Sequence, residues 1–172
     1  MRTFTPAFTK AIQDEETGDP ILAAIVVSHP DMGSIPDLGA PPLRLVRNYE
    51  QVISLGNVYH PYAFEIVLPD QRGDRPPVAR LRFDNVDRMM IAMLRSLTTA
   101  PKIVMQILSP TNLIASPPVF DNVEVSTPDL FWYAVNYDTF TVEGTLEGPT
   151  AFRRQYPRAV MSPAVCPGLF RV

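Results

Sequence analysis

Cysteine, histidine and lysine are scarce in this sequence, which has one, two and two of them among 172 residues. The single cysteine, Cys166, excludes a disulfide within the chain and a metal cluster held by several cysteines. The two histidines, His29 and His60, leave little material for histidine-centred catalysis. The sequence also lacks a glycine-rich phosphate loop, a G-x-S-x-G elbow and a C-x-x-C pair. We therefore expect no enzyme activity and no cofactor.

Charge and long apolar runs are scarce as well. Charged residues make up 19% of the chain and the net charge is −3, so no broad basic surface is available for a phosphate backbone. The longest apolar run, residues 21–27, is too short to cross a bilayer as a helix, and the first residues contain no apolar secretion signal. We expect synthesis in the cytoplasm, no membrane insertion by this chain and no role in binding nucleic acid.

Proline is abundant, with 19 residues, about twice the usual share of about 5%. Because 46% of the residues are hydrophobic, this is the composition of a folded chain with many short elements joined by rigid turns. The patterns predict seven to nine short strands, one central helix and a short N-terminal helix. The expected fold class is mostly β, an antiparallel barrel or sandwich of the α+β type, since helices are too few for a doubly wound α/β fold.

The N-terminal helix is predicted over residues 5–17, with Thr5 as the cap, Pro6 at the first helical position, and Phe8, Ala11 and Ile12 on one face. Strands are predicted at residues 21–27, 43–48, 51–59, 62–69, 78–84 and 102–108 and in two stretches of 128–148.

The central helix follows a strand whose alternation places Ala79, Leu81 and Phe83 on its buried face. Asp84 or Asn85 is the expected cap of that helix. Its predicted buried side carries Val86, Met89, Met90, Met93, Leu94 and Leu97.

In the last predicted strand, Phe140, Val142 and Leu146 alternate with polar residues such as Glu143 and Glu147. The first three are therefore expected in the core and the two carboxylates in water.

Few residues are candidates for chemistry. A metal site from His29, Asp31 and His60 is one hypothesis, but the spacing matches no regular ligand motif, and a structural role at turn entries is favoured for both histidines. The aromatic run Phe131, Trp132 and Tyr133 has two interpretations, a core anchor or a stacking surface, and the core is favoured. The long loop at residues 28–42 is of a length that is often functional.

The chain divides into a predicted domain at residues 1–150 and a C-terminal arm at residues 151–172. The arm holds three prolines, which fix φ and cannot donate hydrogen bonds, so it gains little from its own backbone. It is expected to lie along a surface of a neighbouring protein, or alternatively along its own barrel. For Cys166 itself we favour a small buried hydrophobic residue over a nucleophile.

Five motifs occur in a fixed order, FTPAF, FEIVLP, LRFDNVDR, FTVEGTLEGP and RRQYPRAVMSPAVCPGLF. This order resembles a family of small phage proteins encoded among tail genes. The closing segment is also similar to the lambda-type minor tail protein L family, in which a final strand leads to a proline and arginine stretch and a Val-Cys-Pro motif. The matching positions are residues 140–148, 157–158 and 165–167.

The resemblance implies a structural protein of the virion, a tail-tip hub or adaptor subunit with a β-barrel-like domain in a ring around the tail channel. Three or six copies would join the distal tail ring to the central fibre or receptor-binding proteins, and DNA would only pass through the channel in transit. The iron–sulfur cluster of the minor tail protein L family is not carried over, because Cys166 is the only cysteine of the sequence.

The arm would then be the protein interface, with Leu169 and Phe170 as anchors and Arg153, Arg154 and Arg158 as polar clamps. The full set of expected interface residues is Phe152, Arg153, Arg154, Tyr156, Arg158, Cys166, Leu169 and Phe170. Other functions stay open: a distal tail ring, a head–tail connector, a small tail-associated hydrolase, or a ligand-binding β-barrel.

Overall fold

Ten strands and two helices make up the computed structural model, which describes residues 4–14, 18–36, 38–67, 79–84 and 89–148. The mostly β, antiparallel fold class with one central and one N-terminal helix is therefore confirmed. The elements are α1 (Pro6–Gln13), β1 (Leu22–Ser28), β2 (Leu43–Val46), β3 (Val52–Ser54), β4 (Asn57–Pro61), β5 (Phe64–Val67), β6 (Ala79–Asp84), α2 (Met89–Ser96), β7 (Lys102–Ser109), β8 (Asn122–Ser126), β9 (Leu130–Tyr137) and β10 (Thr141–Glu147).

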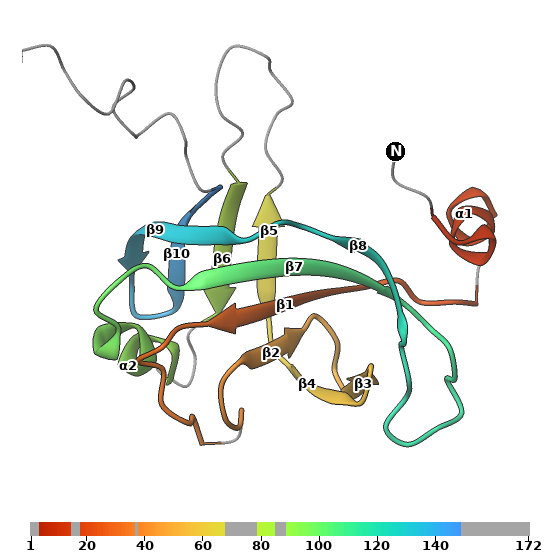
Figure 1. The fold of residues 1–172 in the computed structure, drawn as a ribbon, viewed down its shortest axis with the longest axis horizontal. Helices are drawn as coiled ribbons and strands as arrows, with labels where there is room; N and C mark the ends of the chain where they lie inside the picture. Colours follow the sequence, from red (N-terminus) through yellow and green to blue (C-terminus); the bar gives the residue numbers. More distant parts are fainter. Residues whose placement is uncertain (1–3, 15–17, 37, 68–78, 85–88, 149–172) are drawn as a thin grey trace, which may run out of the picture.

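The strands form one open sheet in the order β3-β4-β2-β1-β7-β9-β10-β6-β5, and β8 pairs with β7 beside β9. All pairs are antiparallel except β2 with β4. β1 and β7 run together along the molecule, while β5, β6 and β10 run across them (Figure 1). The sheet is therefore strongly curled, as in a barrel that has not closed.

The long apolar strand β1 is buried on both faces and separates two cores. Ile25 and Val27 face the larger core, where Leu81, Phe83 and Trp132 meet them from β6 and β9. Leu22 and Ala24 face a smaller core, in which β1 packs with the β3–β4 hairpin, β7 and the segment before β8. The smaller core consists of Leu22, Ala24, Val46, Val52, Tyr59, Leu108 and Phe120. An unbroken apolar run, and not an alternating one, is what a strand covered on both faces requires.

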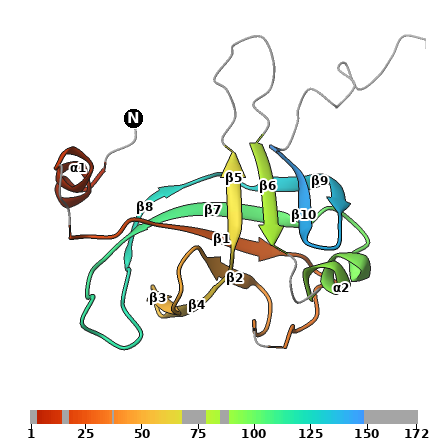
Figure 2. The ribbon, with the colours of Figure 1, turned by 180° about the vertical axis from the view of Figure 1, so that it is seen from behind.

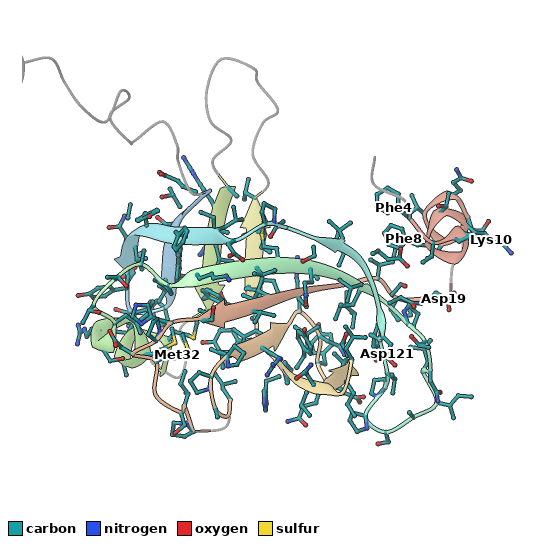
Figure 3. The ribbon with its side chains drawn as sticks, in the orientation of Figure 1. Phe4, Phe8, Lys10, Asp19, Met32 and Asp121 are labelled. Atoms are coloured by element: carbon teal, nitrogen blue, oxygen red, sulfur yellow. The ribbon has the colours of Figure 1, made fainter. Side chains whose placement is uncertain are left out.

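One end of the larger core is covered by α2 and by the loop before β2. Met90 and Met93 of α2 are buried in this core. Met32 and Leu38 of the loop at residues 28–42 are buried in the same cluster, and Figure 3 shows Met32 next to α2. This loop is therefore a covering layer of the core, although its length had indicated a functional loop.

α1 stands at the opposite end of the molecule and is joined to β8 through its cap (Figures 1 and 2). Thr5 is the N-cap, its hydroxyl accepts from the Phe8 N–H, and Pro6 occupies the first helical position. The Thr5 N–H donates to the carboxylate of Glu124 at 3.0 Å. In Figure 3 Phe4 and Phe8 lie on the side of the helix nearer to the sheet, and the Phe8 side chain is buried.

Some details differ from the predictions. α1 ends at Gln13, and Ile12 on its apolar face is 60% exposed. Phe140, expected in the core, is 71% exposed because it lies in the β9–β10 turn and not in the strand. Val142 and Leu146 are buried as predicted. The cap of α2 and the position of Val86 fall partly outside the described residues, and nothing is described of the Met89 side chain.

Candidate functional site

A groove of about 870 Å³ lies along β5, where a barrel would close if another strand were present. Phe64 and Glu65 of β5 form one wall, and residues 47–49 after β2 line the other side. Arg82 and Asp84 of β6 also line it, together with Asn48, Tyr62 and the segment that joins β4 to β5. The groove therefore follows from the topology, since it occupies the gap between the two arms of the curled sheet.

The outer edge of β5 carries backbone groups that pair with no strand of the described residues. Asp84 N–H donates to Ala63 C=O at 3.1 Å, and the register pairs Glu65 with Arg82. Because hydrogen-bonded and non-bonded pairs alternate in an antiparallel ladder, the N–H and C=O groups of Phe64 and Ile66 point away from β6. In the part of the chain that the structure describes, no strand lies on that side.

The opposite end of the sheet is covered, in contrast to β5. Ile53 of β3 bridges to Val119, its N–H donates to Pro118 C=O at 3.0 Å, and its C=O accepts from the Phe120 N–H at 2.8 Å. The loop between β7 and β8 thus pairs with the outer edge of β3. Unpaired edges are sites of strand addition, and proteins usually cover or charge them. Among the described residues, one edge of the sheet is covered and the β5 edge is open.

Aromatic and charged side chains surround the groove at β5. Tyr49 is fully exposed at its rim, and the Tyr62 hydroxyl donates to Asp84 C=O at 2.9 Å. Arg82 of β6 stands opposite Glu65 on β5 and opposite Glu143 on β10, so one cation lies between two carboxylates across three strands. These features favour a peptide with both aromatic and charged side chains over a purely apolar ligand.

A smaller hollow of about 420 Å³ lies on the outer face of β5, β6, β9 and β10. Gly144 lines it at a β-bulge, opposite Ala134, whose φ is +49°. A Cβ placed on Gly144 would lie 2.3 Å from Nε1 of the buried Trp132. Glycine is needed here because the indole packs directly against the backbone. Trp132 is thus a core anchor, as the sequence predicts.

The far end of the molecule carries exposed apolar side chains on two neighbouring turns. Leu55 in the β3–β4 turn is 65% exposed, and Ile114 in the β7–β8 loop is 97% exposed. The two turns lie side by side in Figures 1 and 2, and the Leu55 N–H donates to Asp121 at 2.7 Å. This apolar surface is a second candidate for protein contact.

The two histidines have separate structural surroundings. His29 is buried, its Nδ1 accepts from the Asp31 N–H at 3.0 Å, and its Nε2 lies 2.7 Å from the Thr99 hydroxyl. Both ring nitrogens of His29 are therefore engaged. His60 is half-buried, with Nδ1 3.4 Å from the Gln51 side-chain nitrogen. Among the described residues, no three histidine, cysteine, aspartate or glutamate side chains gather as a metal site.

Two ionisable groups have shifted pKa values. Burial raises the pKa of Tyr59, against a smaller lowering by Arg44, and the Tyr59 hydroxyl donates to Gln106 at 2.9 Å. For Glu124, burial acts to raise the pKa, but hydrogen bonds from Thr5 and Ser109 outweigh it and the pKa is lowered overall. Both groups join elements to the sheet, and neither lines the groove.

The interface residues predicted on the arm, from Phe152 to Phe170, lie outside the described residues, so their contacts stay a prediction. The groove was not among the features predicted from the sequence. The pattern predicts β5 as a strand, and the signal that it lies at an edge is the pair of prolines on either side, Pro61 and Pro69.

Neither a protein-family model nor a curated protein matches this chain. In the described part of the chain, neither helix has the length and apolar character needed to cross a membrane.

Proposed function

We propose that this chain is a structural subunit of a long-tailed phage or phage-like particle, located at the tail tip. In this role it is a hub or adaptor subunit, present in three or six copies around the DNA channel. It joins the distal tail ring to the central fibre or receptor-binding complex. The order of motifs in the sequence, and the closing Val-Cys-Pro segment, support this placement.

The observation that carries the assembly role is the open edge of β5 beside a groove of about 870 Å³. A ring subunit needs surfaces that receive its neighbours, and an unpaired strand edge provides main-chain hydrogen bonds for that purpose. The exposed Leu55 and Ile114 at the far end supply a second surface of a different kind. Two different surfaces on one subunit are what a head-to-tail ring contact or a contact with another protein requires.

Location in the particle tests this proposal. An antibody against the chain, with immunogold electron microscopy of particles from the host, is expected to label the distal end of the tail. Label at the head–tail joint would support a connector in place of a tail-tip subunit. Absence of the chain from purified particles would overturn the structural role.

A ligand-binding β-barrel is the second candidate, because the groove is lined by Arg47, Arg82, Tyr49 and Tyr62. The two functions predict different oligomeric states of the purified chain. Sedimentation velocity over a wide concentration range is expected to show association for the ring subunit. A chain that stays monomeric and binds a small molecule would instead be a ligand-binding protein.

A further inference from the structure

We propose that the β5 edge receives residues 150–156 of a neighbouring copy as an added strand. The inference rests on the proposed function, since it requires copies of this chain to meet. The edge offers the outward N–H and C=O groups of Phe64 and Ile66 over a four-residue strand. An extended segment that pairs with such groups extends the sheet by one strand, the mode of recognition known as β-augmentation.

The groove provides the room for that strand. An added strand runs about 4.8 Å from its neighbour, in the plane of the sheet. The groove of about 870 Å³ extends from β5 to residues 47–49 on this side of the sheet. The fully exposed Tyr49 at its rim would be covered by the incoming segment. The edge and the groove together define one site.

The sequence of residues 150–156 suits this site. TAFRRQY is a run of seven residues without proline, bounded by Pro149 and Pro157, so each of its residues has an N–H. In a strand, Phe152, Arg154 and Tyr156 share one face, and Arg153 and Gln155 share the other. The first face carries aromatic side chains for a groove lined by Tyr62, Phe64 and Asp84.

Charge complementarity identifies the partner as the C-terminal segment of this chain. Residues 149–172 carry four arginines and no acidic residue. Residues 1–148 then hold the remaining 11 basic and all 18 acidic side chains, a net charge of −7. Glu65 is exposed on β5. If two β5 edges paired, the two Glu65 carboxylates would lie close together and repel each other, whereas an arginine-bearing strand would be attracted to Glu65.

Chain length limits how much of the segment can reach the β5 edge of its own molecule. In its own molecule, the strand position beyond β5 is three strand spacings from β10, or about 14 Å. From Glu147, the last residue of β10, to residue 150 an extended chain covers roughly 10–11 Å. The whole run 150–156 therefore fits only along the β5 edge of a neighbouring copy. Its later residues alone can reach the four-residue β5 of the same chain, and the cross-linking test separates that outcome.

Cross-linking between two full-length variants tests the proposal. Both carry Cys166→Ser; one also carries Val67→Cys and the other Gln155→Cys, with different affinity tags. Val67 is 53% exposed at the end of β5. The two are mixed and treated with a short bismaleimide, so a product that joins both tags forms only between copies. The matched control replaces Val67→Cys with Val58→Cys, since Val58 on β4 is 43% exposed.

The expected yield with Val67→Cys is at least roughly tenfold above that with Val58→Cys, because a docked segment has a high effective concentration at its own site. Arg153→Glu with Arg154→Glu is expected to lower the yield, and so is added salt. A second variant, Ile66→Pro, removes an outward N–H without touching the β6 ladder and is expected to lower the yield as well.

Four results would overturn the inference. Equal yields at the two cysteine positions would show that β5 is not the site. Cross-linking inside a Val67→Cys, Gln155→Cys double variant, without any product between copies, would show that the arm closes its own barrel. Association of copies in sedimentation without the mixed product would leave the proposed function standing and reject only this contact. Absence of all association would contradict both.

Discussion

Gly144 is the residue at which a single methyl group has the largest predicted effect. Its missing side chain leaves space for the Trp132 indole, whose Nε1 would lie 2.3 Å from an added Cβ. Neither residue of this contact can move aside easily, because Trp132 is buried and Gly144 lies in a bulge between β9 and β10. The bulge and the indole are thus one packing unit.

We therefore expect Gly144→Ala to lower the free energy of unfolding by about 1–3 kcal/mol, the usual effect of overpacking a core. Urea denaturation followed by tryptophan fluorescence measures it, since Trp132 is the only tryptophan. Gly148→Ala is the matched control, because no atom lies within 4 Å of a Cβ there. Equal stabilities of the two variants would contradict the packing described for Trp132.

Leu55 is strained through its backbone conformation and not through a clash of side chains. The β3–β4 turn has positive φ at both central residues, +49° at Leu55 and +75° at Gly56. Asparagine tolerates the left-handed region far better than leucine, so Leu55→Asn is expected to stabilise the protein by roughly 1 kcal/mol. Thermal unfolding measures this, with Leu113→Asn as a control at an exposed leucine without positive φ.

If Leu55 belongs to a contact surface, the same Leu55→Asn variant is expected to weaken assembly while it raises the melting temperature. Strain retained at an exposed apolar residue is the pattern of a functional position. A variant that is more stable and assembles as well as the natural chain would remove Leu55 from the interface.

At the scale of elements, α1 depends on one carboxylate. Glu124 of β8 accepts hydrogen bonds from the Thr5 N–H and from Ser109, and Thr5 is also the cap of α1. Burial acts to raise the pKa of Glu124, but these hydrogen bonds lower it overall below the ordinary value of 4.5. The contribution to stability is therefore present above the ordinary pKa and is lost as the pH falls through the lowered pKa of the folded state.

We expect amide hydrogen exchange in α1 to become faster as the pH is lowered below the ordinary glutamate pKa of 4.5, after correction for the intrinsic exchange rate. Glu124→Gln is expected to give fast exchange in α1 already at neutral pH. The control is Glu143→Gln, because Glu143 is exposed on β10. Exchange in α1 that is independent of pH in the natural chain would contradict the anchoring role of Glu124.

The sequence predicts the secondary-structure elements better than it predicts which elements pair with one another. The alternation of Ala79, Leu81 and Phe83 and the apolar run at residues 21–27 predict strands correctly, because side-chain periodicity is local. The pairing that leaves β5 at an edge is set by contacts distant in the sequence, such as Phe64 with Phe83 and Thr141 with Asp84. The groove could not be predicted for that reason.

Phe140 shows a second limit of prediction from the local sequence pattern. Its position two residues before Val142 continued the alternation of β10, so it was predicted in the core. The strand begins at Thr141, and the Asp138 N–H donates to Thr141 C=O in a tight turn that leaves Phe140 in water. Turn geometry, and not hydrophobicity, decides the exposure of this residue.

For the whole molecule, we propose that a curled sheet whose β5 edge is open among the described residues joins copies of this chain. β3 is covered by the β7–β8 loop, whereas the β5 edge borders a groove and pairs with no other described strand. Homo-oligomers of this kind form closed rings if each contact turns the next copy by a fixed angle. In the proposed contact, the acidic residues 1–148 of one copy would attract the basic C-terminal segment of the next, which would give the contact a direction.

Electron cryo-microscopy of the particle formed by the full chain, co-expressed with the proteins encoded beside it, tests this claim most directly. We predict a closed ring of three or six copies in which the chain of a neighbour lies against every β5 edge. A ring in which β5 faces solvent, or a chain that remains a single copy under these conditions, would contradict it.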